Sequence, residues 1–163
     1  EDLANELMTY DKFGDQITKN RFVKNIVEAL PPAVEAATPT EKAKLIYAFL
    51  ANNLEWDGSY GYVCGNTINK VFDEKRGSGV DLNMMLIALL RHFNIDAYPV
   101  LLSTRNHGKV QPLYPFLNQF NHVIAVAVID EKATFLDLSA SDHPMGMLGT
   151  ASLNKNGLLI LNE

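Results

Sequence analysis

Residues 80–93 are apolar almost all the way round, and this stretch constrains the fold more than any other part of the sequence. Its apolar side chains do not form a single helical stripe but fall on every face, at Val80, Leu82, Met84, Met85, Leu86, Ile87, Leu89 and Leu90. A helix without a polar face is buried at the centre of a domain. The sequence therefore predicts a central helix that other elements cover on all sides.

Length and composition describe an ordinary globular domain. The 163 residues suit one compact unit, and 47% are hydrophobic while 20% are charged. No stretch approaches the about 20 apolar residues of a membrane span, so we expect no transmembrane segment. The chain begins Glu-Asp-Leu rather than with Met. We therefore expect a single domain, residues 1–163, excised from a longer multidomain protein.

Charge and cysteine usage argue against several kinds of partner. The net charge is −5 and there is no basic run, whereas phosphate binding needs clustered Lys and Arg, so nucleic acid is not expected. Cys64 is the only cysteine, which rules out an internal disulfide and a Cys-rich zinc site. The spacing of His92, His107 and His143 does not suit metal ligands. We expect no metal and no cofactor.

The first half of the chain predicts helices. Residues 21–37 have helical apolar spacing that Pro31-Pro32 breaks or kinks. Thr38 can cap the next helix, and with Glu41 it forms a capping box for a helix that runs to about Asn53. A short helix is expected over residues 67–74, between loops at 57–61 and 75–79. The aromatic residues of the loop 60–62 either cover the core or line a groove.

The second half predicts strands at about 97–103, 121–129, 134–138 and 158–161. Residues 130–132 are typical of a hairpin turn, and residues 104–118 form a long, polar, exposed loop. If Asp130-Glu131 is a two-residue turn, His122 faces Ser139 and Asp137 lies diagonally from His122 on the same face. Helices followed by strands indicate an α+β domain rather than alternating units.

Several segments, in this order, resemble the transglutaminase-like superfamily of papain-like fold, over roughly residues 41–149. Residues 45–56 are similar to the helix that ends in the family's I-x-W signature, with Trp56 as its aromatic. Residues 76–81 (RGSGVD), followed by Leu86 and residues 89–91, resemble G-x-C-x-D/E…L-x-x-L-L-R. Residues 94–100 match the turn and strand after that helix. Residues 120–123 (FNHV) and 135–137 (FLD) resemble the strands of the catalytic His and Asp.

The resemblance implies N-terminal helices and a buried central helix packed on an antiparallel sheet of about three to five strands. It also implies a cysteine nucleophile at the start of the central helix, where the positive end of the helix dipole lowers a thiol pKa. With Gly77 and Asp81 matched to the motif, that position is Gly79, which has no side chain. His122 and Asp137 remain as a vestigial dyad.

Each candidate residue also has a structural interpretation. Without a catalytic ancestry, His122 would be a buried, hydrogen-bonded structural histidine. Asp137 would then be a residue that caps the loop after its strand. Trp56, Ser78 and Asn121 are candidates for the pocket around Gly79, although Trp56 also suits a core anchor and Ser78 a helix cap. A relocated nucleophile would have to be Ser78 or Cys64, and a lone cysteine is usually a small buried hydrophobe.

The favoured function is therefore a catalytically inactive domain that acts as a binding or scaffold module. By resemblance, the setting is an extracytoplasmic one, in a bacterial cell-envelope or periplasmic protein. The expected partners are a polypeptide, a glycan or peptidoglycan fragment, or neighbouring domains of the same protein. The alternative is an active cysteine-type amide hydrolase or acyltransferase. We also expect a small void beside Gly79, at the helix N-terminus, that attracts an anion or polar group.

Overall fold

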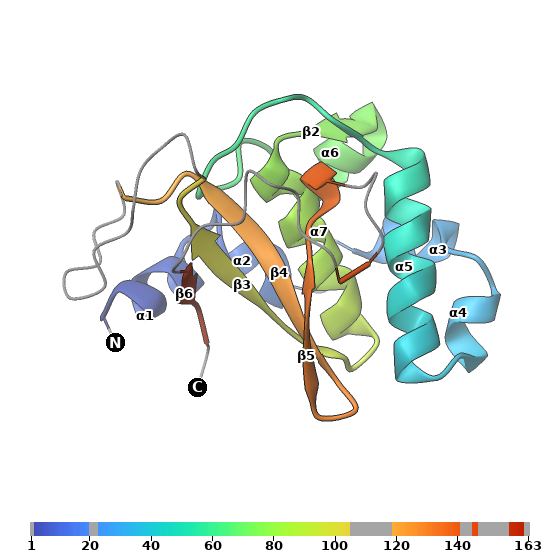
Figure 1. Ribbon diagram of the computed structural model, residues 1–163. Helices are drawn as coiled ribbons and strands as arrows, with labels where there is room; N and C mark the ends of the chain where they lie inside the picture. The colour runs from blue at the N-terminus through green and yellow to red at the C-terminus, as the bar shows by residue number, and fades with distance from the viewer. Residues whose placement is uncertain (1, 20–22, 105–118, 141–144, 147–156, 162–163) are drawn as a thin grey trace.

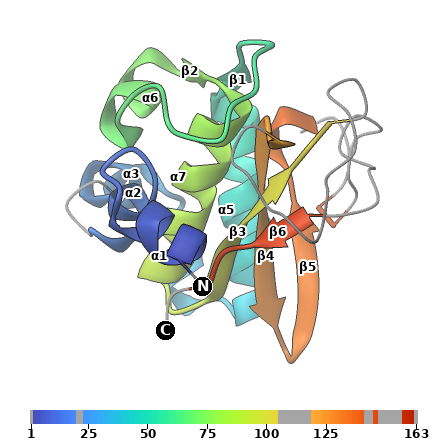
Figure 2. The same cartoon turned by 90° about the vertical axis from the view of Figure 1, so that its left-hand side faces the viewer.

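Helix α7 (Gly79–His92) lies at the centre of the molecule, between a sheet and the N-terminal helices (Figure 2). The computed structural model describes residues 2–19, 23–104, 119–140, 145–146 and 157–161. The other helices are α1 (Asp2–Thr9), α2 (Gly14–Thr18), α3 (Lys24–Ala29), α4 (Ala33–Ala36), α5 (Pro39–Asn53) and α6 (Ile68–Glu74). The strands are β1 (Glu55–Trp56), β2 (Arg76–Gly77), β3 (Asp96–Leu102), β4 (His122–Ile129), β5 (Lys132–Leu136) and β6 (Gly157–Leu159).

The burial of α7 confirms the prediction of a central helix. Its residues from Gly79 to Leu90 are all buried, including the polar Asp81 and Asn83. Helices α2, α5 and α6 contact it, as do strands β3 and β4 (Figures 1 and 2). Because every face of the helix is covered, each of its polar side chains needs a partner inside the protein.

The main sheet has the order β5-β4-β3-β6, and every neighbouring pair is antiparallel. The side chains that join the core with α7 come from one face of its two central strands and include Ala97, Leu101, Val123, Ala125 and Ala127. A separate pair, β1 and β2, runs parallel. The α+β class and the antiparallel sheet predicted from the sequence are confirmed.

The hairpin between β4 and β5 sets the register of the sheet. Ile129 pairs with Lys132 across a two-residue turn, Asp130-Glu131, whose φ values of 51° and 64° are both positive. Such a turn fits the right-handed twist of the strands. The ladder runs back to the pair of Ala125 and Leu136, and residues 138–140 then form a 3₁₀ turn, in which the hydroxyl of Ser139 lies 3.4 Å from Nε2 of His122. Strand β5 nevertheless occupies residues 132–136 rather than 134–138, because the turn needs only two residues.

Helix boundaries follow the capping signals. Thr38 and Glu41 form the predicted capping box of α5, and Ser78 with Asp81 forms a second one at the start of α7. The expected helix over residues 21–37 is divided into α3 and α4 at the two prolines. Helices α1 and α2 were not predicted from the sequence. The short strand β2 occupies part of the expected loop 75–79.

Some expectations fall outside the described residues. These are the loop over residues 105–118, with His107, and the segment that contains His143. Within the described part of the chain, no helix combines the length and apolar character needed to cross a membrane.

The hairpin generates a prediction about stability. Glu131 adopts a left-handed conformation that is strained for any side chain, so Glu131→Gly should raise the free energy of unfolding by about 0.5–1 kcal/mol. Chemical denaturation measures this change. Glu131→Ala is the matched control, because alanine keeps the strain and should not gain the same stability. A glycine variant less stable than the alanine variant would contradict this account of the turn.

Candidate functional site

His122 and Asp137 meet where β4 begins and β5 ends. The Nε2 atom of His122 lies 3.0 Å from Oδ2 of Asp137, and both side chains are buried. The hairpin brings them near each other, because its ladder is paired as far as Ala125 and Leu136 and Asp137 follows directly after Leu136. The structure therefore brings together the two residues that the sequence predicted as a pair.

Two residues that were not predicted hold the carboxylate of Asp137. The Nδ2 atom of Asn83 donates a hydrogen bond to Oδ1 at 3.0 Å, and Ser139 donates to the same oxygen from its backbone N–H and its hydroxyl. Asn83 also donates to the carbonyl of Val123 and accepts from the N–H of Leu138. A polar residue inside an otherwise apolar helix was the signal that could have identified Asn83.

This network keeps Asp137 ionised. Burial alone would raise the pKa of Asp137, but the hydrogen bond and charge of His122 act in the opposite direction. Together with the hydrogen bonds from Asn83 and Ser139, they lower the pKa of Asp137 to about 2. The carboxylate therefore orients the imidazole through Nε2, which leaves Nδ1 as the nitrogen free to exchange a proton.

The free nitrogen of His122 lies on the side of Gly79, the first residue of α7. A Cβ atom added to Gly79 would lie 2.7 Å from Cε1 and 2.9 Å from Nδ1 of His122. Nδ1 is buried and has no hydrogen-bond partner among the described residues. A side chain at position 79 would thus meet the nitrogen that Asp137 does not hold. This is the relation that a nucleophile and its base require.

The expectation of a void beside Gly79 is wrong. The imidazole of His122 stands within contact distance of the position that a Cβ of residue 79 would take, so no empty space lies beside Gly79 there. The helix N-terminus is also occupied, because the N–H of Gly79 donates to the carbonyl of Ser59 at 2.9 Å. An anion therefore cannot reach this N–H without displacing the loop that contains Ser59.

The loop from Trp56 to Tyr60 covers the site. The ring of Tyr60 meets the ring of His122 edge to face, with centroids 4.5 Å apart, and Trp56 packs on Tyr60 at 5.0 Å. The indole N–H of Trp56 donates to the carbonyl of Ser59 at 2.6 Å, and the carboxylate of Asp57 accepts from the N–H and hydroxyl of Ser59. Trp56 was predicted near the site, whereas Ser59 and Tyr60 were missed.

The remaining candidate residues have structural partners. The hydroxyl of Ser78 accepts from the N–H of Asp81 at 3.2 Å, so it caps α7. The side-chain amide of Asn121 both accepts from and donates to Thr104, and it ties the end of β3 to the start of β4. These contacts account for the polar groups of both side chains without a ligand.

Cys64 is buried, and its surroundings make it unreactive. Burial raises the pKa of its thiol far above the ordinary range, and the nearby carboxylate of Asp81 raises it further. A thiol with a raised pKa carries almost no thiolate at neutral pH and is a poor nucleophile. Among the described residues, no group of three or more His, Cys, Asp or Glu side chains is arranged to hold a metal ion.

Comparisons with known proteins agree with this geometry. A family model described as the transglutaminase-like superfamily matches residues 28–137. A solved structure of a candidate protease from Parabacteroides distasonis has a TM-score of 0.55 at 13% identity, over 84% of this chain and 28% of the other. A candidate cysteine protease from Cytophaga hutchinsonii has a TM-score of 0.44 at 23% identity, over 60% and 30%. No curated protein gives a match. The chain thus spans under a third of either solved protein.

The ionisation of Asp137 predicts how stability depends on pH. Its pKa is about 2 in the folded protein and about 3.9 in an unfolded chain, so its contribution is complete above about pH 4. As the pH falls from there through about 2, about 2 kcal/mol of stability should be lost. Urea titrations across this pH range should show the loss in the native protein and not in Asp137→Asn. Asp73→Asn, an exposed change on α6, should keep it.

A second prediction concerns Asn83. Asn83→Leu takes away the hydrogen bonds that Asn83 makes to the carbonyl of Val123 and the N–H of Leu138, and one of the three that Oδ1 of Asp137 accepts, so it should lower the free energy of unfolding by about 3 kcal/mol or more. Asn53→Leu is the control, since Asn53 is exposed and makes one hydrogen bond to its own helix. Its cost should stay below about 1 kcal/mol. Equal losses in both variants would contradict the role assigned to Asn83.

Proposed function

Because the chain belongs to the transglutaminase-like superfamily, we propose that it is a member without catalytic activity that serves as a binding or scaffold module. One observation carries the proposal. The residue that faces the free nitrogen of His122 is Gly79, which offers no atom for nucleophilic attack. The chemistry of the family needs a thiolate at the start of the central helix, next to a base that a carboxylate orients. The base and the carboxylate are present and the thiol is missing.

The other two candidate nucleophiles do not replace the missing thiol. The hydroxyl of Ser78 caps α7, and a serine is far harder to ionise than a cysteine without a base in contact. The thiol of Cys64 is buried and its pKa is raised. These contacts support the binding or scaffold role over an amide hydrolase or acyltransferase with a relocated nucleophile.

Closure of the site also supports a role without catalysis. The carbonyl of Ser59 accepts a hydrogen bond from the N–H of Gly79. Without that bond, the N–H would be free to stabilise the oxyanion of an acyl-transfer reaction. Tyr60 covers the imidazole of His122. A polypeptide, a glycan fragment or a neighbouring domain would then contact the outer surface of this loop and leave the buried pair untouched. The setting that we propose is a bacterial envelope protein, outside the cytoplasm, for which the support is the resemblance in sequence.

Restoring a thiol at position 79 tests the register on which the proposal depends. In a Cys64→Ala background, Gly79→Cys should be alkylated by iodoacetamide with a thiol pKa clearly below the ordinary value of about 8.5. The reason is that the thiol would lie at the start of α7, beside the imidazole of His122 once that ring has shifted to admit the new Cβ. Adding His122→Gln should return the pKa toward the ordinary range. The rate of alkylation against pH is the measurement, and an ordinary pKa in the first variant would contradict the register.

The native protein tests the loss of activity directly. After incubation with iodoacetamide and with a fluorophosphonate, mass spectrometry should find no label at Ser78 or Cys64 that depends on His122. Labelling at either residue that His122→Ala abolishes would overturn the proposal and identify an active enzyme. The same His122→Ala variant, checked by circular dichroism, separates a lost base from a lost fold.

A further inference from the structure

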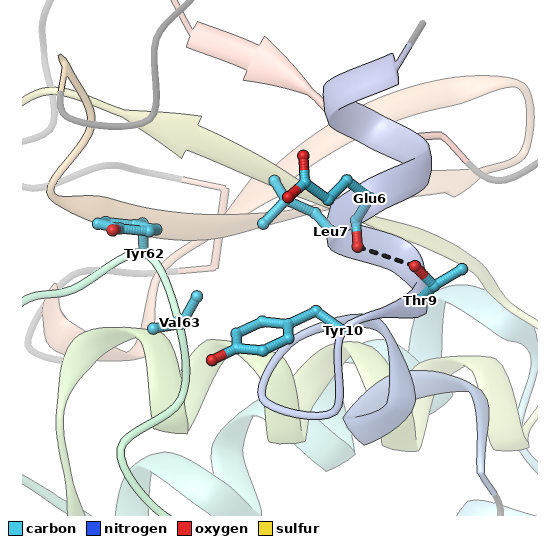
Figure 3. Close-up of a pocket in the computed structure, with 6 residues that line it drawn as sticks. All are labelled: Glu6, Leu7, Thr9, Tyr10, Tyr62 and Val63. Carbon is cyan, nitrogen blue, oxygen red and sulfur yellow. Dashed lines mark hydrogen bonds between the residues drawn. The ribbon is translucent and has the colours of Figure 1, made fainter.

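A pocket of about 410 Å³ opens between α1 and the loop that follows Tyr60 (Figure 3). Helix α1 supplies one side of the hollow, Tyr10 follows that helix, and the other side comes from two adjacent residues of the loop. The described residues that line it are Glu6, Leu7, Thr9, Tyr10, Tyr62 and Val63. Its volume falls in the range of small-molecule and side-chain binding pockets.

The pocket combines apolar walls with one negative charge. Leu7 is buried at its base, while Tyr10 is 43% exposed and Tyr62 and Val63 are half-buried. Thr9 contributes little polarity, because its hydroxyl donates to carbonyls of its own helix. The carboxylate of Glu6 is exposed and makes no hydrogen bond or ion pair with any described residue. An exposed carboxylate in a pocket that two phenol rings also line suits a flat organic cation.

We propose that this pocket binds the arginine side chain of a polypeptide. The proposal rests on the proposed function, to which it adds a ligand, because a module that binds without cleaving needs a recognition surface away from the closed site. A guanidinium group stacks on aromatic rings and pairs with a carboxylate through two parallel hydrogen bonds. Tyr10 and Tyr62 supply the rings, and Glu6 supplies the carboxylate.

Charge and polar groups favour arginine over other ligands. No described residue that lines the pocket is basic, and the net charge of the whole chain is −5, which favours a cationic ligand over an anionic one. A sugar needs several fixed donors and acceptors for its hydroxyl groups. Among the described residues that line the pocket, the hydroxyl of Thr9 is already bonded to its own helix. The other polar side-chain groups are the carboxylate of Glu6 and the hydroxyls of Tyr10 and Tyr62. The observations therefore favour a polypeptide over a glycan.

The position of the pocket connects it to the site already described. Tyr62 lies two residues after Tyr60, whose ring covers His122. Between them, a Cβ added to Gly61 would lie 3.3 Å from Val80 at the start of α7. A peptide anchored by its arginine against Tyr62 would therefore lie over the same loop that closes the site.

Peptide titration followed by nuclear magnetic resonance tests the inference. The probes are three acetylated and amidated tripeptides, Gly-X-Gly, in which X is arginine, lysine or citrulline. The arginine peptide should shift the signals of Glu6, Tyr10 and Tyr62. The citrulline peptide has nearly the same shape without the charge and should bind about tenfold more weakly. The lysine peptide should fall between them, because its ammonium cannot pair and stack in the same way.

Variants separate the pocket from general charge attraction. Glu6→Gln should weaken binding of the arginine peptide by about tenfold, whereas Asp73→Asn removes the same charge from α6 and should change it little. Tyr10→Ala should weaken binding by about threefold, and Tyr10→Phe should retain it because the face of the ring remains. The three residues changed in these four variants, Glu6, Asp73 and Tyr10, have exposed side chains, and circular dichroism checks that each variant folds.

Four outcomes would overturn the inference. They are no shift of the pocket signals, equal binding of the citrulline and arginine peptides, equal effects of Glu6→Gln and Asp73→Asn, and tighter binding of a neutral disaccharide such as cellobiose. The last would assign the pocket to a glycan. Mass spectrometry of the recovered arginine peptide distinguishes a failure of the proposed function from a failure of the proposed arginine pocket. A cleaved or acylated peptide would contradict the absence of catalysis, whereas an intact peptide that does not bind would contradict the pocket alone.

Discussion

The arrangement of the whole domain depends on a helix that has no face in water. Helix α7 carries two polar side chains into the core, and each is satisfied by groups from distant parts of the chain. Asp81 accepts from the backbone N–H groups of Ser78 and Gly65 and so fixes the loops at the helix N-terminus. Asn83 joins the helix to β4 and to the residues after β5. Because a buried polar group without a partner is costly, these bonds determine where the sheet lies against the helix.

The same constraint explains why a His–Asp pair is stable beside a glycine. Asp137 is one end of the network that Asn83 organises, and its carboxylate is ionised at neutral pH. Removing His122 would leave a buried charge with one partner fewer, which is expensive in the interior. The pair therefore has a structural role as well as a chemical relation to Gly79. Retention of the pair is weak evidence for activity, because stability alone is enough to keep it.

The sequence predicted those features that depend on local pattern, and missed those that depend on distant partners. The apolar character of α7 on every face, the capping box at Thr38 and the hairpin turn at residues 130–132 are local, and each was confirmed; the structure gives the turn two residues. The turn also brought His122 and Asp137 to the same end of the hairpin, since register passes along its ladder as far as Ala125 and Leu136. Asn83 and Ser59 were missed because their partners lie far away in the sequence or belong to the backbone, and neither leaves a periodic signal.

The glycine at position 79 and the closed loop are parts of one structural state. A Cβ atom there would also approach Tyr60 to 3.3 Å, so any larger residue has to move either the imidazole of His122 or the ring that covers it. In the present structure His122 can pack close to α7, and Tyr60 can pack on His122, because position 79 has no side chain. Once that packing exists, a restored cysteine must displace buried rings before it can meet a substrate. The glycine at position 79 and the closure of the site thus stabilise each other.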